Sequence, residues 1–308
     1  MTTMDGRPAA ELSGQGDIRF GVQVDILDLP EFWDLGMCSD VGIDADDRLW
    51  VASRRQHPIS LWSSVDGSFI GSWPAGDFVE VHHIAPVGNA LWVVDDQLHV
   101  VRRYEQDGTM TKEMGRRGMA MAAVTHRGQN GGPFNMPTGI AAGRNGELFV
   151  SDGYGNRQVH RFAPDGTLEK SWGRGGTGPG EFGPVHSVTV DGTDRVIICD
   201  RENNRVQLFD YDGGFVEEWG GLYGPADAAV GADGLVYVVE QGDSINGRMN
   251  FQPNGISVLT MAGSVVGHWY EASSGGMVGG HGIAVDSLGN VYVADLVGKR
   301  VVKMVRER

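Results

Sequence analysis

Residues 282–295 have the sequence GIAVDSLGNVYVAD. A short apolar run, a turn containing Gly and Asn, and a second run of mostly apolar residues together predict an antiparallel β-hairpin. The pattern recurs along the chain, which predicts six structural units. The six copies are SDVGIDADDRLWVAS (39–53), HHIAPVGNALWVVD (82–95), TGIAAGRNGELFVSD (138–152), HSVTVDGTDRVIICD (186–200), ADAAVGADGLVYVVE (226–240) and HGIAVDSLGNVYVAD (281–295).

A second hairpin follows the first in each unit. The clearest examples are NRQVHRFAPDGTLEKSW (156–172) and NRVQLFDYDGGFVEEW (204–219), in which Asp-Gly turns join the third strand to the fourth. The copies begin 40 to 56 residues apart, close to the roughly 40–50 residues of a propeller blade. The sequence therefore predicts an all-β, six-bladed β-propeller with four-stranded blades. An open solenoid would need distinct polar caps at its ends, and none is evident.

The ends of the chain predict how the propeller closes. The last copy supplies about three strands, ending near Met304, so we expect residues 18–26 (IRFGVQVDI) to add the missing strand. Residues 18–308 then form one propeller closed by an N-terminal strand, and residues 1–17 are expected to be a flexible segment.

Two long intervals between copies predict loop insertions at about 113–135 and 241–255. We expect these loops to set specificity. Three of their residues are placed within reach of a bound ligand, or else are ordinary solvated loop residues: His126, Arg248 and Asn250.

The net charge, the cysteine content and the lack of long apolar segments limit which partners and compartments we expect. The 308 residues carry a formal net charge of −15, which excludes the clustered basic surface that nucleic-acid binding requires. The two cysteines, Cys38 and Cys199, are expected to be buried thiols, and a reducing compartment follows. Because the sequence has neither a secretory signal nor a long apolar span, we expect a cytoplasmic protein with no membrane partner.

The residue that opens the innermost strand is histidine in every second copy. In a six-bladed ring, alternate blades are related by three-fold symmetry, so three imidazoles would meet on the axis and could hold a divalent metal ion with open positions. A single histidine at a strand start is more often a hydrogen-bonded turn residue, and only the alternation favours a metal. The six equivalent residues are Ser39, His82, Thr138, His186, Ala226 and His281.

One of these assignments has an alternative. The turn in the second copy is one residue shorter than in the others, so His83 is an alternative ligand to His82. We favour His82 because Ile84 then keeps its inward register.

Hairpin geometry brings the end of the second strand to the same face as these histidines. Arg54 and Arg201 follow that strand in the first and fourth copies and suit a carboxylate, although ion pairs between blades are an alternative. Tyr154 follows it in the third copy. A tyrosine pKa near 10 falls beside a dication and a guanidinium, so Tyr154 becomes a candidate base, or else a packed loop tyrosine.

Acidic residues also end several of these second strands. Asp152, Asp200 and Asp295 occupy one repeat position and are expected to cap loop amides. We therefore assign them to the scaffold rather than to the chemistry.

These residues support a resemblance to a known group. GNVYVAD, DRENNRVQLFD and GTGPGEF resemble NHL-repeat propellers. Within that group, residues 18–308 resemble the peptidyl-α-hydroxyglycine α-amidating lyases. The resemblance implies zinc, or another divalent transition metal, on the three histidines, an essential tyrosine at Tyr154 in DGYGN, and active-site arginines at Arg54 and Arg201.

The implied reaction is cleavage of a carbinolamide. In the family, zinc binds the substrate hydroxyl, the tyrosine accepts a proton, an arginine holds the carboxylate, and an amide and glyoxylate are released. Two departures are evident. Gly282 follows His281 where the family has an aspartate that helps hold calcium, which makes a structural calcium doubtful, and Gly155 replaces a disulfide cysteine.

The sequence thus predicts a zinc-dependent lyase acting on a small α-hydroxy substrate, a carbinolamide or hydroxy acid that bears a carboxylate. One alternative is a non-catalytic NHL propeller that binds a protein or ligand on one face. The other is a lactonase-like hydrolase, which would require calcium on oxygen ligands, whereas the innermost positions carry histidine.

Overall fold

The structure of the protein is a computed structural model that describes most of the chain. All regular structure in the described residues consists of β-strands and two short 3-10 turns, η1 (Ala75–Asp77) and η2 (Arg201–Asn203). The chain divides into unit 1, Met1–Ala75 with Ala226–Arg308, and unit 2, Gly76–Pro225. The described residues are 9–10, 12–16, 18–122, 134–242, 254–271 and 276–307.

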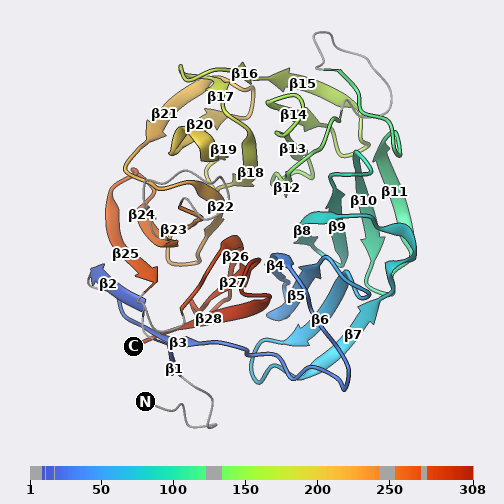
Figure 1. The fold of residues 1–308 in the computed structure, drawn as a ribbon. Helices are drawn as coiled ribbons and strands as arrows, with labels where there is room; N and C mark the ends of the chain where they lie inside the picture. The colour runs from blue at the N-terminus through green and yellow to red at the C-terminus, as the bar shows by residue number, and fades with distance from the viewer. Residues whose placement is uncertain are drawn as a thin grey trace. The chain divides into compact units, whose positions relative to one another are not determined.

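Unit 2 contains three four-stranded antiparallel sheets, whose strands lie side by side in chain order (Figure 1). A short parallel pair joins β16 (Arg174–Gly175) to β17 (Glu181–Phe182) between the second and third sheets. The three sheets are β8 (Val81–Val87), β9 (Ala90–Asp95), β10 (Val100–Glu105) and β11 (Met110–Gly115); β12 (Gly139–Ala142), β13 (Leu148–Asp152), β14 (Gln158–Phe162) and β15 (Leu168–Trp172); and β18 (Val185–Val190), β19 (Arg195–Asp200), β20 (Arg205–Asp210) and β21 (Phe215–Trp219).

Unit 1 contains the other three sheets, so the prediction of six four-stranded antiparallel blades is confirmed. Two of these sheets also carry a short additional strand from the start of the chain. The strands are β4 (Cys38–Ile43), β5 (Arg48–Ser53), β6 (Ile59–Ser63) and β7 (Phe69–Trp73); β22 (Pro225–Val230), β23 (Leu235–Glu240), β24 (Gly255–Thr260), β25 (Val265–Glu271) and β2 (Leu12–Gly16); and β26 (Gly280–Val285), β27 (Val291–Asp295), β28 (Arg300–Arg306), β3 (Phe20–Gln23) and β1 (Ala9–Ala10).

The start of the chain completes the last sheet. β3 pairs antiparallel with β28, with Val22 opposite Met304. Residues 1–17, expected to be a flexible segment, contain two strands: β1 pairs with β3, and β2 pairs with β25. β25 is the outermost of the four strands of its blade, and β2 pairs with main-chain groups that such an edge exposes.

In three blades the first hairpin is stabilised by an aspartate at its turn. In β18–β19, Asp191 Oδ1 accepts hydrogen bonds from the main-chain N–H groups of Thr193 and Arg195, at 2.7 and 2.9 Å. Asp44 and Asp286 cap the equivalent turns of β4–β5 and β26–β27 in the same way. These local bonds explain why the copies with an aspartate at this position of the first turn form tight hairpins.

Apolar side chains fill the space between neighbouring sheets of each unit. In unit 2, one cluster lies between the first and second sheets and another between the second and third, because alternate residues of β13 face opposite ways. Val150 belongs to the first cluster and Phe149 to the second. Unit 1 repeats this arrangement with Val293 and Tyr292 of β27. Each sheet therefore depends on its neighbours for burial.

The predicted insertions lie partly outside the described residues. Residues 113–115, expected to begin a loop, instead end β11, and Gly255, expected to end the second loop, begins β24. The three loop residues singled out from the sequence, His126, Arg248 and Asn250, lie outside the described residues.

Two Asp-Gly turns of unit 1 provide a test of the close packing of Ile26 against Gly67. Gly67 and Gly234 have positive φ angles of +76° and +75°, but a Cβ on Gly67 would lie 1.8 Å from the carbonyl oxygen of Ile26, whereas a Cβ on Gly234 would meet nothing within 4 Å. Gly234→Ala should cost roughly 1–2 kcal/mol through its backbone conformation alone. Gly67→Ala should cost at least roughly 2 kcal/mol more. Urea unfolding measures both, and equal losses would contradict the close approach of Ile26.

Candidate metal and catalytic site

The three histidines predicted as metal ligands occupy equivalent, irregular positions in their sheets. The register between the first and second strands shifts across His82 in β8, across His186 in β18 and across His281 in β26. Ser39 occupies the same position in β4. A β-bulge of this kind turns a side chain away from the direction that the strand alternation would give it. All three histidines are buried.

The side-chain hydrogen bonds define the tautomer of two of these histidines. In unit 2, His82 Nδ1 lies 2.7 Å from the carbonyl oxygen of Thr138, and in unit 1, His281 Nδ1 lies 2.6 Å from that of Ser39. A carbonyl oxygen only accepts hydrogen bonds, so each Nδ1 carries the proton and each Nε2 presents a lone pair. This is the form in which a histidine binds a metal ion through Nε2.

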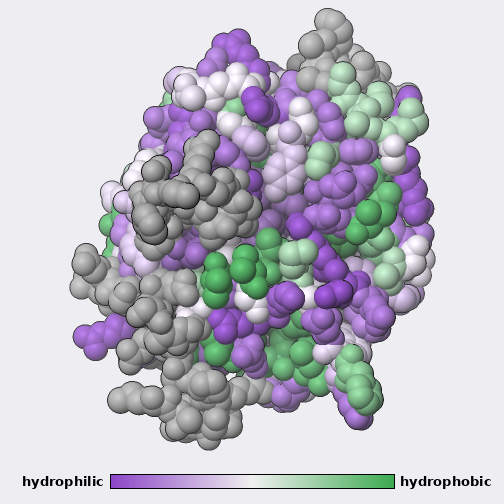
Figure 2. Space-filling model, in the orientation of Figure 1, coloured by the Kyte–Doolittle hydropathy of each residue, from purple (hydrophilic) through white to green (hydrophobic). Residues whose placement is uncertain are grey.

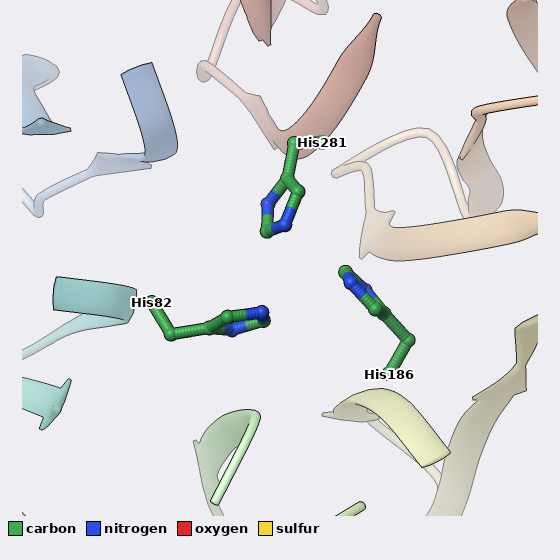
Figure 3. A group of neighbouring side chains, drawn as sticks. All are labelled: His82, His186 and His281. Carbon is green, nitrogen blue, oxygen red and sulfur yellow. The ribbon is translucent and has the colours of Figure 1, made fainter. Parts of the chain in front are cut away.

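Unit 2 brings His82, His186 and Tyr154 together. The His82 and His186 rings lie 5.0 Å apart, centroid to centroid, and the two side chains extend toward the same space (Figure 3). The Tyr154 hydroxyl donates a hydrogen bond to His82 Nε2 at 2.9 Å, and the Tyr154 ring lies 5.9 Å from that of His186. The tyrosine predicted as a base therefore touches a predicted metal ligand. Figure 3 also draws His281, which belongs to β26 of unit 1.

Glycines on both sides hold Tyr154 in place. A Cβ on Gly153 would lie 1.6 Å from the carbonyl oxygen of Val185, and one on Gly155 would lie 2.2 Å from the Asn135 side chain. Only glycine fits at these positions without a backbone shift. The DGYG segment can therefore pack against the start of β18, which carries His186 one residue after Val185.

Arg201 joins the same group in unit 2. It is the first residue of η2, and its guanidinium carbon lies 5.9 Å from the centroid of the Tyr154 ring, as in a cation–π contact. Glu202 Oε1 accepts hydrogen bonds from Arg201 Nε and Nη2 at 3.0 and 2.7 Å. The side chains of Arg201 and Glu202 are only 8% and 18% exposed. Glu202 was not predicted as a site residue, although its position directly after Arg201 in DRENN is a signal for such a pair.

Arg54 lies in unit 1, at the corresponding place in its own sheet. It directly follows β5, its main-chain N–H donates to the carbonyl oxygen of Met37 at 3.0 Å, and it is half-buried. Arg54 and His281 therefore each lie at the strand end predicted from hairpin geometry.

The repeated aspartates cap loops, as predicted. Asp152 accepts a hydrogen bond from the Asn135 N–H, Asp200 from that of Gly183, and Asp295 from that of Gly279, each at 2.8 Å. Burial raises the pKa of Asp200 above its ordinary value, although Asn203 and Arg205 donate to its carboxylate. These groups hold the loops around the candidate site.

His83 and Asp40 lie one residue beyond the bulges. His83 is in register opposite Val94, and burial lowers its pKa to about 4, so it is neutral at pH 7. In unit 1, the Asp40 carboxylate lies 1.9 Å from where a Cβ of residue 282 would be. Gly282 therefore leaves room for this carboxylate, and an aspartate there would collide with it.

The two cysteines lie inside the protein. Cys38 and Cys199 are buried free thiols, as predicted. Burial raises the pKa of Cys38 to about 12. Within the described part of the chain, no helix has the length and apolar composition needed to cross a membrane.

Comparison with known proteins first shows the structural class of the chain. A family described as "6-bladed beta-propeller" matches residues 142–220. A gluconolactonase from Xanthomonas campestris superimposes with a TM-score of 0.66 over 97% of this chain and 98% of its own, at 12% identity, so this likeness concerns the fold. The prediction of a six-bladed β-propeller is confirmed.

Two relatives are more specific. The chain is 29% identical to NHL repeat-containing protein 3 of Mus musculus over 294 residues, which cover 86% of this chain and 78% of the relative. It is 31% identical over 144 residues to a probable peptidyl-α-hydroxyglycine α-amidating lyase of Caenorhabditis elegans, covering 46% of this chain and 39% of the relative. The predicted resemblance to NHL-repeat and amidating-lyase propellers is therefore confirmed at modest identity.

Two Glu–Arg pairs of unit 2, one in η2 and one between β20 and β21, test the burial of Glu202. Glu202→Gln should cost roughly 3 kcal/mol, because it leaves the buried Arg201 charge without its carboxylate. Glu218 pairs with Arg205 but is 48% exposed, so Glu218→Gln should cost less than about 1 kcal/mol. Chemical unfolding of both variants measures the difference, and equal costs would contradict the assignment of a buried ion pair to Glu202.

Proposed function

We propose that the protein is a metal-dependent lyase of the amidating-lyase type, with zinc held by His82, His186 and His281. The observation that carries this proposal is the shared geometry of the three histidines. All three are bulged residues at equivalent strand starts, and two present an Nε2 lone pair because Nδ1 donates to a carbonyl. Imidazole nitrogens suit zinc and other divalent transition metals.

The donor set fits a catalytic rather than a structural metal ion. Three protein ligands leave a coordination position for substrate, whereas structural zinc sites usually have four. A bound zinc ion would polarise the hydroxyl oxygen of the substrate as a Lewis acid. The substrate class that we infer is a small α-hydroxy compound with a carboxylate, such as an N-acylated α-hydroxyglycine.

The roles of the protein residues follow from their positions. Tyr154 is our candidate for the base that accepts the proton of the substrate hydroxyl as a phenolate, because its hydroxyl lies 2.9 Å from His82 Nε2, the nitrogen that would bind zinc in its place. Arg201, which Glu202 orients and which lies near the Tyr154 ring, offers a cation for the substrate carboxylate. Arg54 is the second candidate for that carboxylate. The hydroxyl oxygen becomes the aldehyde oxygen of glyoxylate, the C–N bond breaks, and the amide nitrogen takes a proton.

A non-catalytic NHL propeller that binds a protein or ligand is the second candidate. The specific observation in its favour is that the relative named only for its NHL repeats matches more of this chain than the amidating lyase does. This alternative predicts no metal dependence. A lactonase-like hydrolase rests on likeness of fold alone, and its calcium would prefer oxygen ligands over imidazole.

Metal content tests the histidine assignment. We expect one zinc ion per chain in purified protein, and His186→Ala or His281→Ala should release most of it during dialysis against a weak chelator. His57→Ala is the matched control, because His57 stacks on Trp33 and contacts Ser72 instead. Elemental analysis measures the ratio. Unchanged zinc in the His186→Ala protein would remove the basis of the proposal.

Glyoxylate release tests the role of the tyrosine. Tyr154→Phe should lower kcat for an N-acyl-α-hydroxyglycine by roughly 10²–10⁴-fold, as expected for loss of a general base, while zinc content stays the same. Tyr211→Phe, which changes a half-buried tyrosine in another part of unit 2, should leave kcat within about twofold. A Tyr154→Phe protein with the kcat of the unmodified chain would exclude Tyr154 as the base.

A further inference from the structure

We propose that Met37, Val278 and Val297 form an apolar rim that binds the acyl group of the substrate. The inference rests on the proposed function and makes its substrate class more specific. The preferred substrate would be an α-hydroxyglycine whose acyl group is an apolar chain longer than acetyl. All three residues belong to unit 1.

The main-chain bonds at the start of β26 place two rim residues together. Val278, three residues before His281, donates its N–H to Asp295 Oδ2 at 3.1 Å, and Leu296 donates its N–H to the carbonyl oxygen of Gly279 at 2.9 Å. A Cβ on Gly279 would lie 2.5 Å from Val297 Cγ2. Val278 and Val297 therefore flank one strand end, the end that carries His281.

Met37 reaches the same place from the neighbouring sheet. It lies two residues before Ser39, whose carbonyl oxygen accepts the hydrogen bond from His281 Nδ1. Figure 2 shows hydrophobic side chains gathered on the surface over β26 and β4, the two strands concerned. The rim is therefore a local feature of this strand end rather than scattered exposure.

The rim residues are partly exposed although they adjoin a buried core. Met37, Val278 and Val297 are 42%, 38% and 48% exposed, whereas the adjacent Met277 and Cys38 are buried. Contiguous apolar patches, unlike apolar residues scattered singly over a surface, mark places where another molecule binds. An aliphatic chain that covered these side chains would remove apolar surface from water, which stabilises the complex.

A cation at the same strand end indicates what kind of molecule binds. The main-chain N–H of Arg54 donates to the carbonyl oxygen of Met37, so a guanidinium-bearing residue adjoins the rim. Together, Arg54, His281 and the rim match a ligand with a carboxylate at one end and an apolar chain at the other. A protein partner or a second copy of this chain would contact the valines, but it would not need a carboxylate group facing Arg54.

Binding of an unreactive ligand pair tests the rim independently of catalysis. Hexanoylglycine and acetylglycine share the carboxylate and the amide but lack the hydroxyl, so they bind without reacting. By titration calorimetry, we expect the intact protein to bind hexanoylglycine about tenfold more tightly. Val278→Thr with Val297→Thr, which keeps side-chain shape but adds hydroxyls, should reduce the ratio to about twofold.

The matched control changes two exposed valines elsewhere. Val216 and Val265 lie on β21 and β25, and replacing both with Thr should leave the ratio unchanged. A ratio near one in the intact protein, or an equal fall in the control, would overturn the proposal. A sedimentation coefficient that falls in the rim variant, with no change in the binding ratio, would assign the valines to self-association instead.

Turnover separates failure of this inference from failure of the proposed function. If N-hexanoyl-α-hydroxyglycine and its acetyl analogue both release no glyoxylate but the binding ratio holds, the lyase proposal fails and the rim stands as a binding site for acylated carboxylates. If both release glyoxylate with equal KM and the binding ratio is near one, the lyase stands and the rim fails.

Discussion

A hydrogen bond from an imidazole to the backbone of the neighbouring sheet organises the candidate site. His82 Nδ1 donates to Thr138 in unit 2, and His281 Nδ1 donates to Ser39 in unit 1. Each bond runs from a bulged histidine to a carbonyl oxygen at the start of the neighbouring sheet, that of Ser39 in β4 or that of Thr138 directly before β12, and places the proton on Nδ1. The same contact therefore serves packing and chemistry, because it satisfies a buried polar group and leaves Nε2 as the nitrogen that a metal ion would use.

Other residues near the same strand ends fix the loops around this hydrogen bond. Asp152, Asp200 and Asp295 bind loop amides at the second strand, and Gly153 lets the Tyr154 loop approach β18. Positions where the repeats agree are therefore structural. Positions where they differ, directly after the second strand, provide Tyr154 and the two arginines. This division of roles is how a repeated scaffold carries different functional residues in different repeats.

Local sequence signals predicted the hairpins, because turn aspartates and glycines act over a few residues. Comparing the copies then identified the residues of the candidate site, including the three histidines. What the sequence did not reveal depends on contacts distant along the chain. The bulge at His82 follows from pairing with β9, the strand pairing of Leu12–Gly16 depends on β25, and the Arg201–Glu202 pair depends on how η2 is buried. The pairing of Leu12–Gly16 and the Arg201–Glu202 pair occur once and have no repeat, and the bulge, although it recurs at equivalent strand starts, produces no change in the hydrophobic period of the sequence.

X-ray absorption at the zinc edge tests the central claim most directly, because it counts the ligands around the bound metal. The claim predicts three imidazole nitrogens at about 2.0–2.1 Å, with the remaining coordination from oxygen. The number of imidazoles should fall to two when His186 is replaced by Ala. A spectrum dominated by carboxylate oxygen or by sulfur, or one unaffected by that replacement, would contradict the account.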